Sequence, residues 1–413
     1  MQELSNKYRI YWKKLQENTL ELSKSAHGDI LIEWGNRMVI SADYLRNKII
    51  KSLQQQGFCI QDGNITLPEN VSKKDIRALH QLSTASKILH VSPKLKKKES
   101  ILLSYFAFGT EITPSRISPR LRLVKSGSLD ELLFRYACLH WSIPVSSGYG
   151  RRLRFLVFDD YNGKLIGLFG LGDPVFSLKA RDQWVGWGVD ERKKRLKYVV
   201  DAFVLGAVPP YNYLLGGKLI AMLAASNEVQ AAFREKYQDR QSLISGNVHD
   251  GKLAMLTTTS ALGRSSIYNR LKYRNRLLYK SVGFTVGSGD FHFANGIYEE
   301  LVEFAKWHCK PTAKKDQWGK GFRNRREVIR KVLSELGLSW KLAFHQVRRE
   351  IFVIPLARNA QAFLQGVDSD LLHYEHPADD MFEWFRKRWL LPRAEREQRY
   401  RSFNPENLRL WKE

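Results

Sequence analysis

The spacing of apolar residues in the first hundred positions predicts a mostly helical region. Helical spacing runs through residues 8–12, 43–50 and 73–88. Two short apolar runs on either side of Asp62-Gly63-Asn64 predict a small β-ribbon between these helices. Helices around a ribbon are compatible with a winged-helix-like module that reads DNA, although such patterns are common in unrelated folds. The alternative is a helical accessory layer.

The pattern changes to that of an α/β sheet in the middle third. A helix is predicted at residues 129–141, and two apolar runs then flank Asn162-Gly163. Asn-Gly between apolar runs is the strongest short-range signal for a β-hairpin. Strand, helix, strand, helix and strand are then expected in turn at residues 196–208, 213–226, 253–259, 268–278 and 281–293.

Basic helices with one strand, at residues 350–355, fill the last hundred positions. Around Arg386, Lys387 and Arg388, the apolar side chains of an amphipathic helix are predicted to pack on the body: Trp384, Phe385, Trp389 and Leu390. A lysine-rich run at 93–98 marks a boundary. The prediction is an α/β (α+β) fold in three modules: a helical, winged-helix-like module at 1–98, a mixed-sheet core at 99–305 and a basic helical module at 306–413.

The charge balance points to an anionic partner. Among 413 residues, 67 are Lys or Arg and 42 are Asp or Glu, which gives a net charge of +25. Each third of the chain has an excess of basic residues, so the whole body is basic rather than one tail. Such a surface favours nucleic acid, and DNA in particular, as the partner.

Several classes of protein are excluded by what the sequence lacks. No stretch approaches the ~20 consecutive apolar residues of a membrane span, and the start of the chain has no apolar signal segment. Cys59, Cys138 and Cys309 stand alone, as in a protein of the reducing cytoplasm. No HxH, HExxH or paired-cysteine spacing occurs, so no metal is predicted. His292, between two phenylalanines, is expected to be a core residue.

The first candidate site is Gly216-Gly217-Lys218, where a strand enters a helix. Two glycines there expose backbone N–H groups and the positive end of the helix dipole, which suit phosphate or pyrophosphate. The motif is neither a P-loop nor GxGxxG. The alternative is that the glycines only let the helix pack closely on the sheet.

The second candidate follows a predicted buried strand, where ligand sites of α/β proteins are usually built. Thr259, Ser260 and Tyr268 are the candidate catalytic residues, and Arg264 and Arg270 are placed to hold phosphate. The alternative is a polar loop that caps the next helix.

Aromatic residues interleaved with basic ones form the third candidate, a composition typical of nucleic-acid surfaces. A second basic run at 192–195 adds to it. The predicted nucleic-acid-binding residues are Arg264, Arg270, Lys272, Tyr273, Arg274, Arg276, Arg192, Lys193, Lys194 and Arg195. An ordinary solvated face is the alternative. Asp159, Asp160 and Asp173 near strand ends are candidates for Mg²⁺ in a nuclease, although Asp is also a common turn residue.

Three segments, 211–221, 256–271 (LTTTSALGRSSIYNRL) and 279–285, resemble the DruA family, named after a component of Druantia anti-phage defence systems. The resemblance implies a defence protein that works with other subunits, such as a helicase, and relatives also occur with mobile elements. More weakly, the middle region resembles the GNAT-like acyltransferase topology, of which the phage Mom protein looks like a distant relative. Its acyl-CoA loop is replaced here by residues 213–218, so the cofactor is left unassigned.

Three hypotheses follow. The leading one is a cytoplasmic, DNA-binding subunit of a multi-gene anti-phage system with a GNAT-like core. The second is a nucleobase-modifying transferase that uses Gly216 and Gly217 for a cofactor. The third is a mobile-element endonuclease or transposase-like protein that uses the three aspartates.

Overall fold

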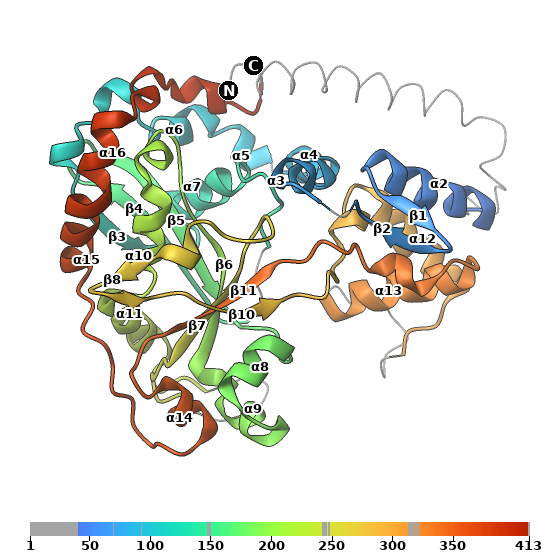
Figure 1. Cartoon of the computed structure of the whole chain (residues 1–413). Helices are drawn as coiled ribbons and strands as arrows, with labels where there is room; N and C mark the ends of the chain where they lie inside the picture. Colours follow the sequence, from blue (N-terminus) through green and yellow to red (C-terminus); the bar gives the residue numbers. More distant parts are fainter. Residues whose placement is uncertain are drawn as a thin grey trace. The chain divides into compact units, whose positions relative to one another are not determined.

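The structure is a computed structural model that describes residues 40–68, 70–91, 93–146, 150–241, 246, 248–312, 318 and 322–411. It divides into two compact units (Figure 1). Unit 1 combines the described residues up to Leu89 with Gly287–Val347, and unit 2 combines His90–Val286 with Arg348–Glu413. Each unit is therefore built from two separate stretches of chain, whereas the sequence suggested consecutive modules. The boundaries at residues 98 and 305 stay predictions of where independently folding modules begin and end.

Unit 2 is built on a mixed seven-stranded sheet in the order β10-β11-β7-β6-β5-β4-β3. Its strands are β3 (Pro119–Leu123), β4 (Arg152–Asp159), β5 (Lys164–Gly172), β6 (Val199–Ala207), β7 (Met255–Thr259), β10 (Lys280–Phe284) and β11 (Glu350–Pro355). Only β6 and β7 pair in parallel; all other neighbours are antiparallel. The predicted α/β class is thus confirmed.

The hairpin predicted at Asn162-Gly163 joins β4 to β5. Gly163 has a φ of 71°, a conformation that glycine adopts without strain. The Asn162 side chain accepts a hydrogen bond from the Lys164 amide at 3.0 Å, which closes the turn.

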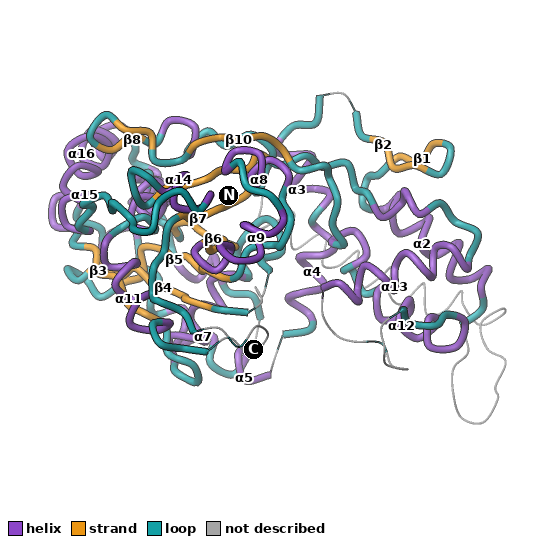
Figure 2. Tube along the Cα trace, turned by 90° about the horizontal axis from the view of Figure 1, so that it is seen from below, coloured by secondary structure: helices purple, strands orange, loops and turns teal. Residues whose placement is uncertain are grey.

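Alternate residues of the central strands face two different helical layers. Val200, Leu256 and Phe352 lie in a core with helices α10 (Gly216–Leu223), α11 (Asn227–Tyr237) and α15 (Ala378–Phe385). Their neighbours Val199 and Met255 lie in a core with α8 (Lys179–Val185) and α14 (Ala360–Gln365). Figure 2 shows these strands in orange among purple helices. We call the two sides the α10 face and the α8 face.

The remaining helices of unit 2 are peripheral to the central strands. α7 (Leu129–Cys138) packs on β4, and α9 (Val189–Arg195) packs on α14. The others are α5 (Pro93–Lys96), α6 (Glu99–Leu103) and α16 (Leu391–Arg396), which follows a π-helical turn at Arg386–Leu390. Phe385 and Leu390 are buried and Trp384 and Trp389 pack against the core, so the predicted aromatic face is confirmed.

Two predicted elements are wrong. Residues 268–278 are not a helix: a 3₁₀ turn (Tyr268–Arg270) leads into a hairpin of β8 (Lys272–Tyr273) and β9 (Arg276–Leu277). Arg274 and Asn275 both have positive φ, as a two-residue hairpin turn requires. The strand expected at 281–293 ends at Phe284, and Phe291–Phe293 forms a 3₁₀ turn in unit 1.

Unit 1 is helical apart from the predicted ribbon. Its elements are α2 (Ala42–Gln55), β1 (Cys59–Gln61), β2 (Asn64–Thr66), α3 (Lys73–Leu79), α4 (Gln81–Leu89), α12 (Ile297–His308) and α13 (Phe322–Glu335). Lys48 of α2 pairs with Glu300 of α12 at 2.6 Å, which joins the two stretches of chain. His292 is fully buried, as predicted. The helix expected at 73–88 is divided at His80, and the segment 8–12 lies outside the described residues.

Candidate nucleic-acid interface

The first two candidate sites meet at the carboxyl ends of the parallel strands. β6 and β7 pair only from Val199–Met255 to Asp201–Thr257, after which the ladder between them stops. β6 then leads to the start of α10, while β7 leads into the loop at 260–267. The two segments touch, because a Cβ atom built on Gly217 would lie 3.4 Å from Ile267 Cδ1. Ligands of open α/β sheets bind at such strand ends.

Gly216 has a packing role at the start of α10. It is buried, and a Cβ atom there would lie 2.7 Å from the Tyr211 carbonyl oxygen and 2.9 Å from Ala207 Cβ. Any larger residue would push the helix away from the end of β6. The packing alternative therefore explains Gly216, whereas Gly217 would meet only an ordinary contact.

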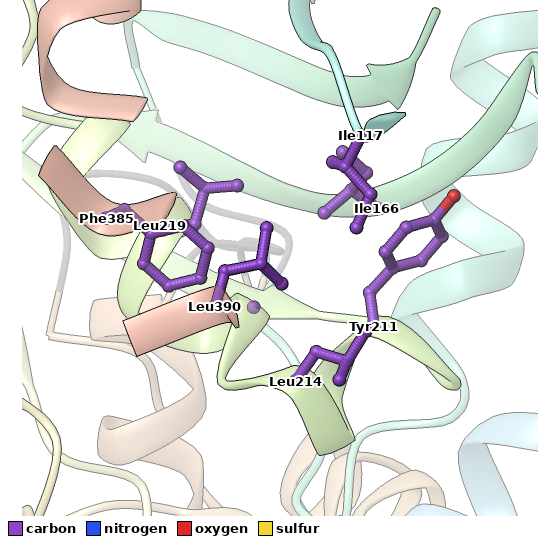
Figure 3. Close-up of a pocket in the computed structure, with 8 residues that line it drawn as sticks. Ile117, Ile166, Tyr211, Leu214, Leu219, Phe385 and Leu390 are labelled. Carbon is purple, nitrogen blue, oxygen red and sulfur yellow. The ribbon is translucent and has the colours of Figure 1, made fainter. Parts of the chain in front are cut away.

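A small apolar cavity lies beneath this helix start (Figure 3). Its volume is about 10 Å³, and it is lined by Ile117, Ile166, Tyr211, Leu214, Gly216, Leu219, Phe385 and Leu390. This volume is comparable to one water molecule, and no polar group lines it. A nucleotide or acyl-CoA does not fit in this cavity. A cofactor bound by Gly216, Gly217 and Lys218 therefore stays a prediction, and it would have to lie on the outer surface of the helix start.

Lys218 is half-buried and faces the C-terminal segment. Its ammonium group lies 4.7 Å from the centre of the Trp389 ring, a cation–π distance. Burial lowers the pKa of Lys218, since the charged ammonium loses water around it.

Buried Glu350 holds the loop that follows β7. Its carboxylate accepts hydrogen bonds from the Ser265 amide (2.9 Å), Asn269 Nδ2 (2.8 Å) and Ser281 Oγ (2.8 Å). The Ser260 amide donates to the backbone oxygen of the same glutamate. Glu350 was not among the predicted site residues, because an acidic side chain at the start of an otherwise apolar strand does not by itself indicate which groups it binds.

The candidate catalytic hydroxyls are spread over the edge and the core. Thr259 is exposed and Ser260 is buried. Tyr268 stacks on Tyr279 with ring centres 4.7 Å apart, and burial raises the pKa of Tyr268 well above its usual value. Within the described residues, no histidine or carboxylate accepts a hydrogen bond from any of these three hydroxyls. A catalytic role for these three residues stays a prediction, and no described side chain is hydrogen-bonded to them as a general base.

The β8–β9 hairpin turns its aromatic residue inward. Tyr273 is buried and packs edge-on against His376 and Trp384, at 5.2 and 5.8 Å between ring centres. Arg276 lies 3.4 Å over the Tyr374 ring and donates to His376 Nε2 at 2.8 Å. These two predicted nucleic-acid-binding residues therefore anchor the hairpin.

The outward side of this loop and hairpin is cationic. Arg264, Arg270 and Lys272 are exposed, and no carboxylate among the described residues pairs with them. Arg274 is also exposed but forms an ion pair with Asp380 at 2.8 Å. Of the aromatic and basic residues that alternate in the sequence, the ring of Tyr273 is thus buried and most of the charged groups are exposed.

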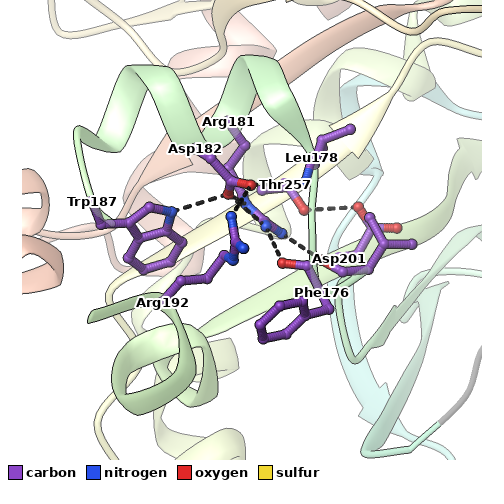
Figure 4. Close-up of polar contacts among 9 residues, drawn as sticks. Phe176, Leu178, Arg181, Asp182, Trp187, Arg192, Asp201 and Thr257 are labelled. Carbon is purple, nitrogen blue, oxygen red and sulfur yellow. Dashed lines mark hydrogen bonds and ion pairs between the residues drawn. The ribbon is translucent and has the colours of Figure 1, made fainter. Parts of the chain in front are cut away.

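The second basic run, at 192–195, is partly used inside the protein (Figure 4). Arg192 Nη1 contacts the Asp182 carboxylate at 3.0 Å, and Arg195 Nη1 donates to the Phe363 carbonyl oxygen at 2.7 Å. Only Lys193 and Lys194 are exposed. This run belongs to the α8 face, opposite the candidate interface.

Asp182 is the centre of the network drawn in Figure 4. Fully buried Arg181 donates to it through Nε and Nη2, at 2.8 and 2.6 Å. Trp187 Nε1 and the Leu178 amide also donate to this carboxylate. The neighbouring Asp201 accepts a hydrogen bond from Thr257 Oγ1 at 2.8 Å, and burial raises the pKa of Asp201 to about 6.

The three aspartates of the nuclease hypothesis are held by separate partners. Buried Asp159 accepts hydrogen bonds from the Tyr211 hydroxyl and the Ser118 amide. Asp160 pairs with Arg120 and Asp173 with Arg151. No group of three acidic, histidine or cysteine side chains in the described ranges is arranged to hold a metal ion.

Comparison with known proteins places the chain. The family described as "Druantia protein DruA" matches residues 70–366. The chain belongs to the DruA family. A curated DruA protein from Escherichia coli (strain UMEA 4076-1), also named "Druantia protein DruA", is 41% identical over 366 residues, which cover 88% of this chain and 90% of the relative. No solved structure matches.

Membership of the DruA family makes the chain a component of a Druantia anti-phage defence system. The match includes stretches of both units, together with the loop after β7 and the whole β8–β9 hairpin. Among the helices described in this DruA-family chain, none is both long and apolar enough to cross a lipid bilayer.

Proposed function

We propose that the protein is a DNA-binding subunit of its defence system and contacts phage DNA or a replication intermediate through the loop and hairpin at 264–276. The observation that carries the proposal is that Arg264, Arg270 and Lys272 are exposed and form no ion pair with a described carboxylate, on a segment whose backbone is held by buried side chains. Glu350 holds the loop and Tyr273 anchors the hairpin. A rigid cationic surface loses little conformational entropy when it binds.

The charge of the whole chain supports the same proposal. A net charge of +25 attracts any polyanion at long range, and phosphate contacts at close range then release counterions. The protein would act in the cytoplasm with other subunits of the system. A helicase is the partner class that the family resemblance favours.

The experiment measures DNA affinity across salt concentrations for wild type and for Arg270→Gln/Lys272→Gln. Each lost phosphate contact should reduce the slope of log affinity against log salt by about 0.9, so the double variant should lose nearly two. Lys125→Gln/Arg135→Gln is the matched control, because both residues are exposed and the variant removes the same charge from α7 and the segment before it, outside the loop and hairpin. Loss of phage protection by the intact gene cluster should accompany loss of binding.

Three outcomes would refute the proposal. They are wild-type protein that does not bind DNA at low salt, binding that is insensitive to salt, and equal losses in the test and control doubles. Circular dichroism of each variant would first establish that it is folded.

A second candidate function is a GNAT-like nucleobase-modifying transferase. The feature in its favour is that β6 runs directly into the turn before α10, as that topology requires. Nucleoside masses of host and phage DNA, with and without the protein, test it; unchanged masses would reject it.

A further inference from the structure

Two cations, Lys218 and Arg388, lie beside one tryptophan on the α10 face, and the segment after β7 brings a third cation, Arg270, toward them. Lys218 comes from α10, Arg388 from the π-helical turn and Arg270 from the loop after β7. The Lys218 ammonium and the Arg388 guanidinium lie 4.7 and 5.6 Å from the centre of the Trp389 ring. Arg270 is brought near Lys218 by the loop itself, because Ile267 Cδ1 lies 3.4 Å from the position of a Cβ atom on Gly217, the neighbour of Lys218. In agreement with this geometry, burial and then the charges of Arg270 and Arg388 lower the pKa of Lys218.

No carboxylate compensates this charge. In the part of the chain that the structure describes, Lys218, Arg270 and Arg388 form no ion pair. Two other arginines of the C-terminal segment, Arg393 and Arg399, do form ion pairs, both with Glu397. Three like charges held together repel one another, and an anion at their centre would relieve this repulsion.

The cluster is also held rigidly. Leu390 and Phe385 are buried and fix the π-helical turn that carries Arg388. Glu350 fixes the loop that carries Arg270, and Ile267 of this loop lies against Gly217. The backbone segments that carry the cations are therefore positioned before any ligand arrives, which reduces the entropic cost of binding.

We infer that Lys218, Arg270 and Arg388 form one phosphate-binding site, with the Trp389 ring as its wall. Arginine and lysine together suit a phosphodiester or a pyrophosphate, since arginine donates in a planar fork and lysine supplies a compact charge. A nucleic-acid strand and a free nucleotide both carry this chemistry. The identification of the ligand as a nucleic-acid strand rests on the proposed function. The inference that the three cations act as one site does not depend on it.

The experiment uses the full chain with Lys218→Met, Arg270→Gln and Arg388→Gln, their three pairwise combinations, and Lys387→Gln as control. Lys387 is exposed and adjacent to Arg388, so its variant removes equal charge next to the cluster. The probes are single-stranded and duplex oligonucleotides over a salt series, and inorganic pyrophosphate by calorimetry.

Each cluster variant should weaken DNA binding roughly fivefold to tenfold at moderate salt and reduce the salt slope by about one. Lys387→Gln should change affinity less than twofold. Because the three cations share one ligand, each pairwise variant should lose less than the product of its two single losses.

The outcomes separate this inference from the proposed function. If wild type binds DNA but the cluster variants behave like Lys387→Gln, or if their losses multiply, the single site is refuted while DNA binding stands. If wild type binds pyrophosphate but not DNA, and the cluster variants lose it, the site stands with a nucleotide ligand and the DNA proposal fails. Binding of neither probe refutes both.

Discussion

The two basic segments of unit 2 look alike in sequence and differ in what their charges do. In the run at 192–195, two of four cations are used by Asp182 and by a carbonyl oxygen of α14. In the segment 264–276, Arg264, Arg270 and Lys272 remain exposed, and none of the carboxylates that the structure describes pairs with them. The segments also lie on opposite faces of the sheet. Charge density along a chain therefore does not distinguish structural cations from binding cations; the nearby acceptors do.

The largest effect on stability is expected when Asp182, the carboxylate that holds two arginines on the α8 face, is removed. Asp182→Ala would leave Arg181, which is fully buried, and Arg192 without their carboxylate. Breaking a buried pair in this way costs about 3–5 kcal/mol, so the urea midpoint of unfolding should fall sharply. Asp190→Ala is the control, since the Asp190 side chain is 78% exposed. Equal midpoints for the two variants would show that the network contributes little.

A smaller effect is expected from Glu350→Gln on the α10 face. The NH2 group that replaces one carboxylate oxygen would face N–H or O–H groups that now donate to that oxygen. This mismatch should lower the free energy of unfolding by about 1–3 kcal/mol. Amide hydrogen exchange at Ser265 should accelerate, and DNA affinity should fall while the salt slope stays unchanged, because no phosphate contact is lost. Exposed Glu395→Gln should alter neither. A changed slope would mean that Glu350 acts on the charges themselves.

Acid should loosen the hairpin through His376. Burial and then the charge of Arg276 lower the pKa of His376 to about 4. Because the folded-state pKa lies below that of the unfolded chain, about 6.5, the unfolded chain binds more protons between these values. Stability present above pH 6.5 is therefore lost as pH falls toward 4.

Hydrogen exchange of the hairpin amides from pH 7 to pH 4 measures this loss. His376→Asn should remove the hairpin-specific part of the pH dependence and leave the part due to other histidines whose pKa burial lowers, among them His140 and His292, both to about 4. An unchanged profile in His376→Asn would assign the acid sensitivity elsewhere.

The smallest effect is expected for Lys193→Ala. The side chain is 62% exposed and its nitrogen lies 3.5 Å from Asp190, so the pair should contribute less than ~0.5 kcal/mol. The unfolding midpoint checks this. A loss above ~1 kcal/mol would show that the whole run, rather than its two arginines, is structural.

Local signals in the sequence predicted much of the fold. Asn162-Gly163 determined one turn by its own conformational preferences, and the apolar runs of β6, β7 and β11 are long enough to indicate buried strands. The hairpin at 272–277 was missed because its turn residues, Arg274 and Asn275, are not a typical pair, and the alternation of Leu271 and Tyr273 is too short to outweigh a helical pattern.

The site was harder to predict because its parts are distant in sequence. The two candidate loops were predicted as separate sites, but the contact between Gly217 and Ile267 follows from the parallel pairing of β6 with β7. Arg388 was assigned to an amphipathic helix without a role, and only tertiary packing places it beside Lys218. Glu350 shows no sign of its three hydrogen bonds in the local sequence.

The position of β11 has a consequence for how the chain folds as it is synthesised. β10 and β11 are hydrogen-bonded neighbours, yet residues 285–349 separate them, and most of these complete unit 1. Until β11 emerges from the ribosome, β7 has an open edge in the middle of the future sheet, and such edges promote aggregation. The earlier stretch of unit 1 likewise waits for Gly287–Val347. Both units therefore reach completion late in translation, and a chain terminated before Val347 would contain neither.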